Sequence, residues 1–108
     1  MDINMDDPVA FRREVAHFER LLALARAQFG PEDPRSLAFA NNLAIGYDAV
    51  GRVDEAIRLD EETLRVRERV LGPEHPDTLS SHSNLAIGYV AVGRTAEAAK
   101  LEETSSTS

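Results

Sequence analysis

Apolar residues recur at steps of three and four in two stretches of the chain, and this spacing places them on one face of an α-helix. The first stretch begins near Pro34, and its stripe consists of Leu37, Ala40, Leu43, Ala44, Tyr47 and Val50. The second begins near Pro76, and its stripe consists of Leu79, Leu85, Ala86, Tyr89 and Val92. Gly51 and Gly93 are expected to end these helices, because glycine adopts the left-handed conformation without a Cβ clash. The pattern therefore predicts two helices of similar length, each with one buried face.

The same spacing predicts three more helices. A helix capped by Asp54 is expected to run for about 17 residues to the break at Gly72-Pro73, and its stripe consists of Ala56, Leu59, Thr63, Val66 and Val70. An earlier helix over residues 8–28 has its stripe at Phe11, Val15, Phe18, Leu22 and Ala25. The last helix is expected to end near Glu103. Residues 1–7 are predicted to form a disordered or capping N-terminus, and residues 104–108 a frayed polar tail.

The chain contains a duplicated unit. The segment that begins at Phe29 aligns with the segment that begins at Leu71 at a constant offset of about 42 residues, with about 19 of 33 positions identical. Each copy is interpreted as two antiparallel helices, A and B, and residues 8–28 as the B helix of a leading repeat that lacks its A helix. One all-α domain is predicted over residues 8–103, with full repeats at 34–70 and 76–103.

Small and large residues at fixed places in the repeat indicate how its helices pack. Ala44 is expected opposite Ala56, and Ala86 opposite Ala98, which lets two backbones approach to roughly 8–10 Å. One helix pair cannot bury its stripe on both sides, so neighbouring pairs must stack. The expected fold is an α-solenoid of about two and a half repeats, a right-handed superhelical stack with one concave side. The structural positions of the repeat are Leu43, Ala44, Tyr47, Gly51, Ala56, Leu85, Ala86, Tyr89, Gly93 and Ala98.

The motifs N-N-L-A-I-G-Y…G-R…E-A and S-N-L-A-I-G-Y…G-R…E-A resemble those of the tetratricopeptide repeat (TPR) family. The long period and the linker G-P-E-x-P-x-[ST]-L resemble the subtype found in kinesin light chains and in bacterial sensor and signalling proteins. The resemblance covers residues 29–103, and residues 8–28 through the B helix only. The chain departs from the family at two repeat positions. Val53 and Thr95 replace an aromatic residue, and Asp60 and Glu102 replace a bulky residue in the middle of helix B, so a lighter core is expected.

The resemblance implies that the chain captures a peptide or a segment of a partner protein in a concave groove lined by the A helices. The helical face about 100° from the core stripe carries the groove candidates. They are Ala38, Asn41, Ile45, Asp48 and Ala49 in the first unit, and Ser80, Ser83, Ile87, Val90 and Ala91 in the second. Isoleucine recurs at this exposed phase, which indicates a surface that is covered either by a partner or by neighbouring helices of the stack.

Asparagines offer further candidates, because one carboxamide supplies both a donor and an acceptor to a peptide main chain. Asn42 and Asn84 occupy the same repeat position, and for them a structural role in helix packing is favoured. Asn41 does not recur and is the better candidate for binding a ligand.

Other chemistry finds little support in the sequence. Three histidines lie on separate elements without metal-site spacing, namely His17, His75 and His82. His75 takes the place of Asp33 in the repeat linker, which indicates a role in the turn. The run Asp60-Glu61-Glu62 is interpreted as a solvated helix face with partners such as Arg65. The glycines follow the repeat and not a phosphate-binding motif, so no enzyme activity, metal or cofactor is predicted.

The acidic composition narrows the expected partners. Lys and Arg number 12 against 19 Asp and Glu, a formal net charge of −7. This charge repels nucleic-acid phosphates and suits a basic or neutral polypeptide, although acidity also serves solubility alone. The chain has no cysteine, no basic signal region and no apolar stretch of membrane length. A cytoplasmic protein without nucleic-acid or membrane partners is therefore expected.

Two alternatives stand beside the leading hypothesis of a non-enzymatic interaction module that binds a peptide or partner segment. The first is self-assembly as a homodimer, because the outer helices lack a polar cap and an apolar face there would include Phe11, Phe18 and Phe39. The second is that the chain is a fragment of a longer repeat-containing sensor, which the end of the pattern after Glu103 motivates.

Overall fold

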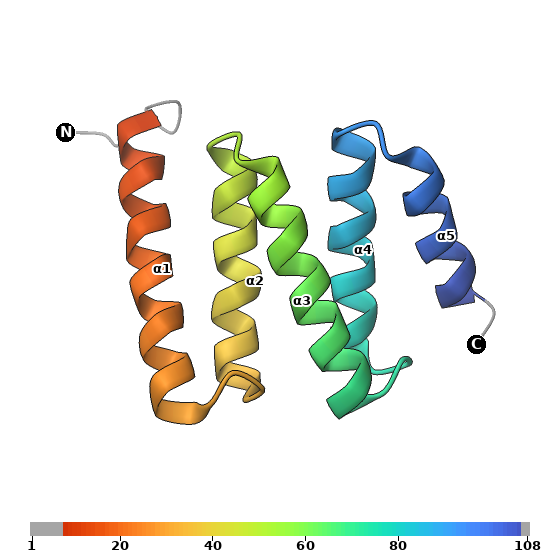
Figure 1. Cartoon of the computed structure of the whole chain (residues 1–108), viewed down its shortest axis with the longest axis horizontal. Coiled ribbons are helices and arrows are strands. Elements are labelled where there is room, and N and C mark those ends of the chain that lie inside the picture. The colour runs from red at the N-terminus through yellow and green to blue at the C-terminus, as the bar shows by residue number, and fades with distance from the viewer. Residues whose placement is uncertain (1–7, 107–108) are drawn as a thin grey trace.

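The computed structural model describes residues 8–106, and the side chains of residues 12–101. Five helices follow one another in an up-and-down array (Figure 1), and they are α1 (Pro8–Phe29), α2 (Pro34–Ala49), α3 (Val53–Leu71), α4 (Pro76–Ala91) and α5 (Thr95–Ser106). Each helix packs against its neighbours in sequence, and no strand occurs within residues 8–106. The predicted all-α solenoid is confirmed. The expectation for residues 1–7 lies outside the described residues.

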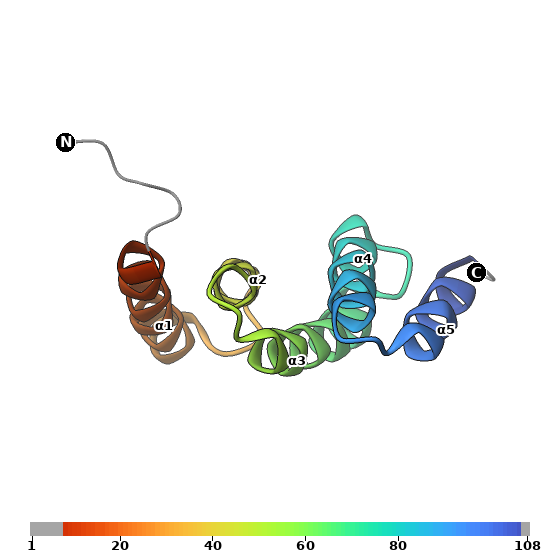
Figure 2. The same cartoon turned by 90° about the horizontal axis from the view of Figure 1, so that it is seen from above.

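The array has two layers when it is seen along the helices (Figure 2). The A helices α2 and α4 lie in one layer, and the B helices α3 and α5 lie in the other, with α1 beside α2 at the N-terminal end. The A helices therefore share one side of the molecule, on which a groove would run.

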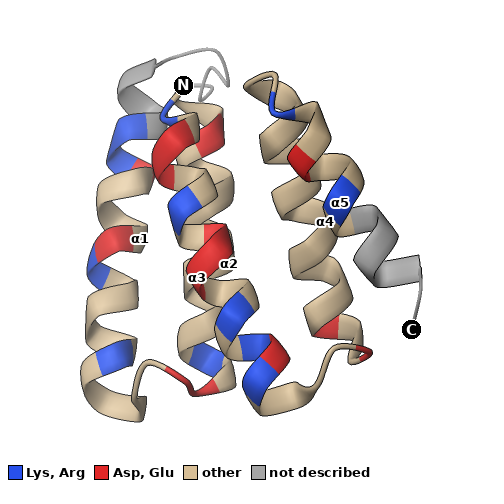
Figure 3. Cartoon of the chain, turned by 45° about the vertical axis from the view of Figure 1, so that its right-hand side comes forward, with Lys and Arg blue, Asp and Glu red and all other residues tan. Residues whose placement is uncertain are grey.

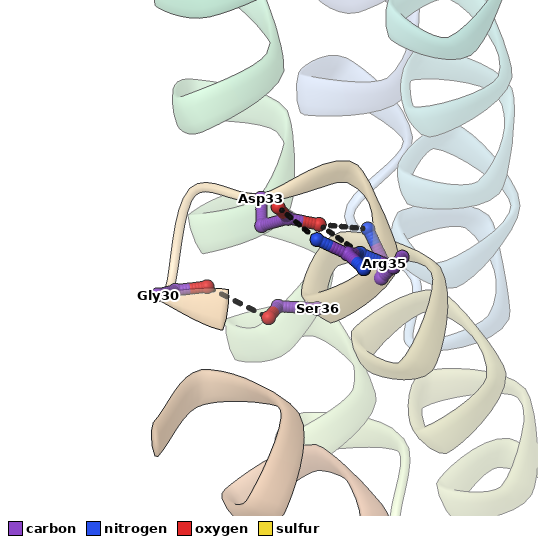
Figure 4. Close-up of polar contacts among 4 residues, drawn as sticks. All are labelled: Gly30, Asp33, Arg35 and Ser36. Atoms are coloured by element: carbon purple, nitrogen blue, oxygen red, sulfur yellow. Dashed lines mark hydrogen bonds and ion pairs between the residues drawn. The ribbon is translucent and has the colours of Figure 1, made fainter. Parts of the chain in front are cut away.

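The linker before α2 caps that helix with a side chain (Figure 4). The Asp33 carboxylate accepts hydrogen bonds from the Arg35 backbone N–H at 2.8 Å and from the Arg35 guanidinium at 3.0 and 3.1 Å. Ser36 Oγ donates to the Gly30 carbonyl at 2.7 Å. These bonds satisfy an orphan N–H of the first turn and hold the linker against the end of α1.

The linker before α4 repeats this cap with different chemistry. His75 Nδ1 accepts a hydrogen bond from the Asp77 backbone N–H at 3.1 Å, so the role predicted for His75 in the turn is confirmed. Thr78 holds the place of Ser36, but its buried hydroxyl has no partner among the described residues.

Both A helices end in the same left-handed glycine turn. Gly51 has a φ of 82° and Gly93 a φ of 80°. After α2, the Arg52 N–H donates to the Tyr47 carbonyl at 2.8 Å and the Gly51 N–H donates to the Asp48 carbonyl at 3.1 Å. This pair of bonds satisfies the last carbonyls of the helix, and it is repeated after α4. The predicted glycine stops are confirmed.

Arg52 occupies the N-cap of α3, where the sequence predicted Asp54, and it makes no side-chain cap bond. Its guanidinium instead binds Glu55 at 2.5 and 2.7 Å and lies 4.5 Å from the centre of the Tyr47 ring. The prediction of Asp54 as the cap is wrong because the arginine and Glu55 form their own clamp over the turn. Arg94, Glu97 and Tyr89 repeat that clamp before α5.

Tyrosine hydroxyls tie each A helix to the preceding B helix. Tyr47 Oη donates to Glu19 of α1 at 2.8 Å, and Tyr89 Oη donates to Glu61 of α3 at 2.7 Å. Burial and the facing carboxylate raise the pKa of each tyrosine to about 12, so both hydroxyls stay protonated as donors.

The core consists of two clusters that meet at α3. The first cluster joins α1, α2 and α3 and contains Val15, Leu22, Ala40, Leu43, Ala44, Tyr47, Ala56 and Leu59. The second joins α3, α4 and α5 and contains Ile57, Leu64, Leu85, Ala86, Tyr89 and Ala98. Both alanine pairs predicted to bring helices together lie within one cluster each, as expected.

α3 is buried along two stripes because it packs against both α2 and α4. The sequence predicted the stripe that contains Ala56 and Leu59, but Val70 at its end is 47% exposed. A second stripe contains Ile57, Asp60, Leu64 and Arg67, all of them buried. The hydrophobic pattern did not indicate this stripe, because two of its four residues are charged.

The last helix reaches Ser106, beyond the expected end at Glu103, but its 12 residues still contrast with the 19 of α3. α5 runs back along α4 and stops short of the first turn of that helix. Leu79, in that turn, is 40% exposed, whereas the equivalent Leu37 under the longer α3 is 4% exposed. Leu79 and Val92, which is 38% exposed, were wrongly predicted as core residues.

Candidate binding groove

The A helices carry almost no charge. Arg35 and Asp77 lie in their first turns, and Asp48 is the one other charged residue on α2 or α4. Most of the charged residues belong to α1 and α3, as the coloured segments of the ribbon show (Figure 3). The exposed residues of α2 and α4 therefore form a largely uncharged surface, which we call the groove face.

Large apolar residues are exposed on the groove face. The exposed fractions of Ile45, Val90 and Ile87 are 56%, 57% and 68%. The structure excludes the alternative that neighbouring helices within residues 8–106 cover the two isoleucines. The other predicted groove residues are also exposed, except for the half-buried Asn41, and they are Ala38, Asp48, Ala49, Ser80, Ser83 and Ala91.

A cavity of about 200 Å³, the central notch, opens between α2 and α4 above α3. It is lined by Ile45 and Asp48 of α2, by Asn84 and Ile87 of α4, and by Asp60 of α3. Three of these residues were predicted for the groove. Asp60 and Asn84 were not, and they come from the buried side of the repeat.

Asp60 is only 5% exposed, so its interpretation as part of a solvated charge run is wrong. Desolvation raises the pKa of its carboxyl to about 7, Asp48 adds to this rise and Arg67 opposes it. No hydrogen bond or ion pair reaches the Asp60 carboxylate among the described residues. The sequence marked this position as a departure from the family pattern, and Asp60 lines the central notch there.

The other two residues of the acidic run, Glu61 and Glu62, lie on different faces of α3 and have different surroundings. Glu61 is half-buried and accepts the Tyr89 hydroxyl, so it does not serve the predicted pairing with Arg65. Glu62 is exposed and lies 3.5 Å from Arg26 of α1.

Arg67 lies two turns beyond Asp60 on α3 and is also buried, at 8% exposed. Its Nη1 donates to Ser81 Oγ at 2.8 Å and to the Asp77 carbonyl at 3.2 Å. These bonds fasten α3 to the start of α4, and no ion pair joins Arg67 to Asp60 among the described residues.

The structure separates Asn84 from Asn42, although the sequence predicted the same structural role for both. Asn84 Nδ2 donates to Asn41 Oδ1 at 2.7 Å, a direct link between the two A helices. The structural role predicted for Asn84 is confirmed. Its hydrogen bond engages the Oδ1 atom of Asn41, the residue that was favoured as a ligand contact. Asn42, paired with Asn84 in the repeat, is exposed instead.

A second cavity of about 310 Å³, the terminal notch, lies between α1 and α2. It is lined by Glu14, Phe18, Asn42, Ile45, Gly46 and Ala49. Its Phe18 and Asn42 align one repeat earlier with Asp60 and Asn84 of the central notch, so the two cavities are equivalent places in successive repeats.

Within the described side chains, no group of three or more His, Asp or Glu is arranged to hold a metal ion. His82 is buried, with Nε2 3.8 Å from Glu68. None of the helices in the described part of the chain is both long and apolar enough to cross a membrane.

Comparison with known proteins places this geometry in a family. Residues 36–107 match the family described as tetratricopeptide repeat. The chain is 39% identical over 62 residues to Protein KINESIN LIGHT CHAIN-RELATED 3 of Arabidopsis thaliana, and 41% identical over 54 residues to Protein KINESIN LIGHT CHAIN-RELATED 2 of the same plant. These matches cover 57% and 50% of this chain but 10% and 8% of the two relatives, so the chain spans about a tenth of their length.

Solved structures agree with the sequence relatives. A crystal structure of nearly identical TPR-like repeats from a Podosopora anserina protein described as a kinesin light chain superposes with a TM-score of 0.82 at 34% identity. A single-substitution variant of the same Podosopora anserina protein gives a TM-score of 0.83 at the same identity. Each match covers 88% of this chain and 45% of the other. The paired helices, the repeated glycine turns and these matches together establish that the chain belongs to the tetratricopeptide repeat family and that its repeats are of the kinesin light chain type.

Proposed function

We propose that this repeat module binds a peptide, or an extended or helical segment of a partner protein, along the groove face of α2 and α4. Repeats of this family generally mediate protein–protein interactions. The observation that carries the proposal is the exposure of isoleucine at the same position of both A helices, Ile45 and Ile87. Solvent favours polar residues at such positions, and an apolar row on an uncharged face gains free energy when a partner covers it.

A selection experiment tests the groove. The full chain is immobilised and presented with a displayed library of random peptides, and the affinity of the enriched peptides is measured for two double variants. Ile45→Asp with Ile87→Asp should weaken binding by at least about tenfold. The matched control is Leu24→Asp with Val70→Asp, which alters exposed apolar residues of α1 and α3 outside both notches. Circular dichroism checks that both variants remain folded. Equal loss in the two variants, or no enrichment of any peptide, would overturn the proposal.

Self-association is a second candidate, and the terminal notch favours it. Phe18 is only partly buried and lines an open cavity at the N-terminal end of the array. A helix from a second copy could pack its apolar side chains there. Light scattering of the full chain across a wide concentration series tests this candidate. A dimer that Phe18→Ser dissociates supports it, and a monomer at every concentration contradicts it. Phe39 is partly buried within the first cluster, and the side chain of Phe11 lies outside the described residues.

A further inference from the structure

Most of the polar side-chain atoms that line the central notch are hydrogen-bond acceptors. Asp48 and Asp60 contribute carboxylates. Asn84 donates one N–H of its amide to Asn41, and its Oδ1 is a further acceptor beside the two carboxylates. No lysine, arginine or histidine is among the lining residues. A cavity built in this way fits a group that only donates hydrogen bonds, and the charged side chains of that kind are lysine and arginine.

Asp60 independently indicates a missing partner. Its side chain lines the notch, it is 95% buried, and within the described residues it has neither a hydrogen bond nor an ion pair. A buried carboxylate without a partner is costly, and an incoming cation relieves that cost more than any neutral group can. Arg67, a buried cation on the same helix, directs Nη1 to Ser81 and to the Asp77 carbonyl and forms no ion pair with Asp60 within the described residues.

The walls of the notch suit the stem of such a side chain. Ile45 and Ile87 stand on opposite sides, one on each A helix, and both are exposed. Lysine and arginine bury their methylene stems against apolar surfaces and keep the charged head in a polar environment. The volume of about 200 Å³ far exceeds the space that a single water molecule needs, which leaves room for one side chain.

We propose that the central notch is a subsite for a lysine or arginine side chain of the bound segment. The methylene stem lies between Ile45 and Ile87, and the charged head binds Asp60 and Asp48. The segment that carries this residue lies on the groove face, so the inference rests on the proposed function and adds the chemistry of the partner to it.

The affinity of the subsite for a cationic side chain should depend on pH. The charged groups that act on Asp60 are Asp48 from α2 and Arg67 from its own helix, and α4 contributes the neutral Asn84. Because the carboxyl of Asp60 has a pKa of about 7, a bound cation displaces its proton. Binding of a cationic side chain should therefore strengthen as the pH rises from about 6 to about 8, and Asp60→Asn should remove most of that dependence.

A small probe tests the notch without any peptide. The isotopically labelled full chain is titrated with n-butylammonium, which reproduces a lysine side chain, and with 1-butanol as the neutral control, while amide resonances are followed by nuclear magnetic resonance. Butylammonium should shift the amides near Asp48, Asp60 and Ile87 together, and butanol should shift them far less. Asp60→Asn should abolish the effect, whereas Asp54→Asn, the same change at an exposed site on the same helix, should leave it intact. Three outcomes would overturn the inference: equal shifts with butylammonium and butanol, equal shifts in the two variants, or no shift at the notch.

Peptides separate this inference from the proposed function. Two forms of an enriched groove peptide are compared, one with lysine and one with norleucine at its basic position. The inference predicts at least about tenfold weaker binding of the norleucine form to the native chain, and no such difference for Asp60→Asn. Groove binding without a preference for lysine would overturn the subsite and leave the groove proposal standing. Butylammonium at the notch with no peptide bound anywhere would overturn the groove proposal and leave the notch as a cation site without a bound segment.

Discussion

At the N-terminal end of the groove, Phe18 of α1 lines the terminal notch, and one repeat further along, Asp60 of α3 lines the central notch at the equivalent place. The surrounding frame is the same in both. Tyr47 donates to Glu19 at 2.8 Å and Tyr89 donates to Glu61 at 2.7 Å. The frame is kept while the residue at this B-helix position changes from aromatic to acidic, so the lining of a notch can change without altering the scaffold around it.

The largest expected effect comes from removing the leucine that each B helix contributes at the same place. Leu22 and Leu64 are 4% and 5% exposed, and truncation to alanine should cost about 2–5 kcal/mol at either site. The loss should be greater for Leu64→Ala, because α3 packs extensively on both α2 and α4, whereas the main partner of α1 is α2. Urea unfolding of both variants measures the difference, and an equal or reversed order would contradict this expectation.

Asp60→Asn should stabilise the chain at neutral and higher pH. The carboxyl has a pKa of about 7 in the folded chain against an ordinary value of 3.8, so the native protein loses stability as the pH rises from about 4 to about 7. Asparagine avoids that loss. The variant should be no more stable than the native chain at about pH 4 and roughly 1–3 kcal/mol more stable above about pH 7. The opening of the notch to solvent limits this difference. Thermal melts at a series of pH values measure this gain. A constant difference at every pH would argue against a buried carboxylate.

The tyrosine frame should contribute equally in both repeats. Tyr47→Phe and Tyr89→Phe each delete a hydroxyl that donates to a carboxylate, and each should cost about 1–2 kcal/mol. Denaturant unfolding at neutral pH measures both costs. Values that differ by more than about 1 kcal/mol would mean that the two frames are not energetically equivalent.

The asparagine pair should give the smallest effect and the sharpest contrast. Asn84→Ala removes the 2.7 Å bond to Asn41 and should cost about 0.5–1.5 kcal/mol. Asn42→Ala, at the aligned and exposed position, should change the free energy of unfolding by less than about 0.5 kcal/mol. Both are measured by thermal unfolding under the same conditions, and a larger cost at Asn42 would reverse the assignment.

Much of the fold could be predicted because repetition doubles each local signal. The apolar stripes and glycine stops occur twice at a constant offset, so two weak indications of a helix pair became one strong indication. The exposed phase of Ile45 and Ile87 followed from helix geometry alone. The end of the last helix was less accurate, because a polar run such as Thr104 to Ser106 has no periodicity from which to place a boundary.

The central notch could be predicted only in part. Asp60 was recognised as a departure from the family, yet its place in an acidic run suggested a solvated face. The second stripe of α3 contains two charged residues, so the hydrophobic pattern of the sequence could not indicate that it is buried. The bond between Asn84 and Asn41 joins positions that are not equivalent in the repeat, so it depends on how successive repeats are offset, which their periodicity does not specify.

Every helix packs against the helices next to it in the chain, which gives the molecule a very low contact order. Chains of this kind fold quickly, because few long loops must close before native contacts form. Structure can begin in either hairpin and spread outward by one helix at a time. Amide hydrogens of α1 and α5 should therefore exchange with solvent faster than those of α3, and the slowest exchange should mark the helix that carries the acidic floor of the groove.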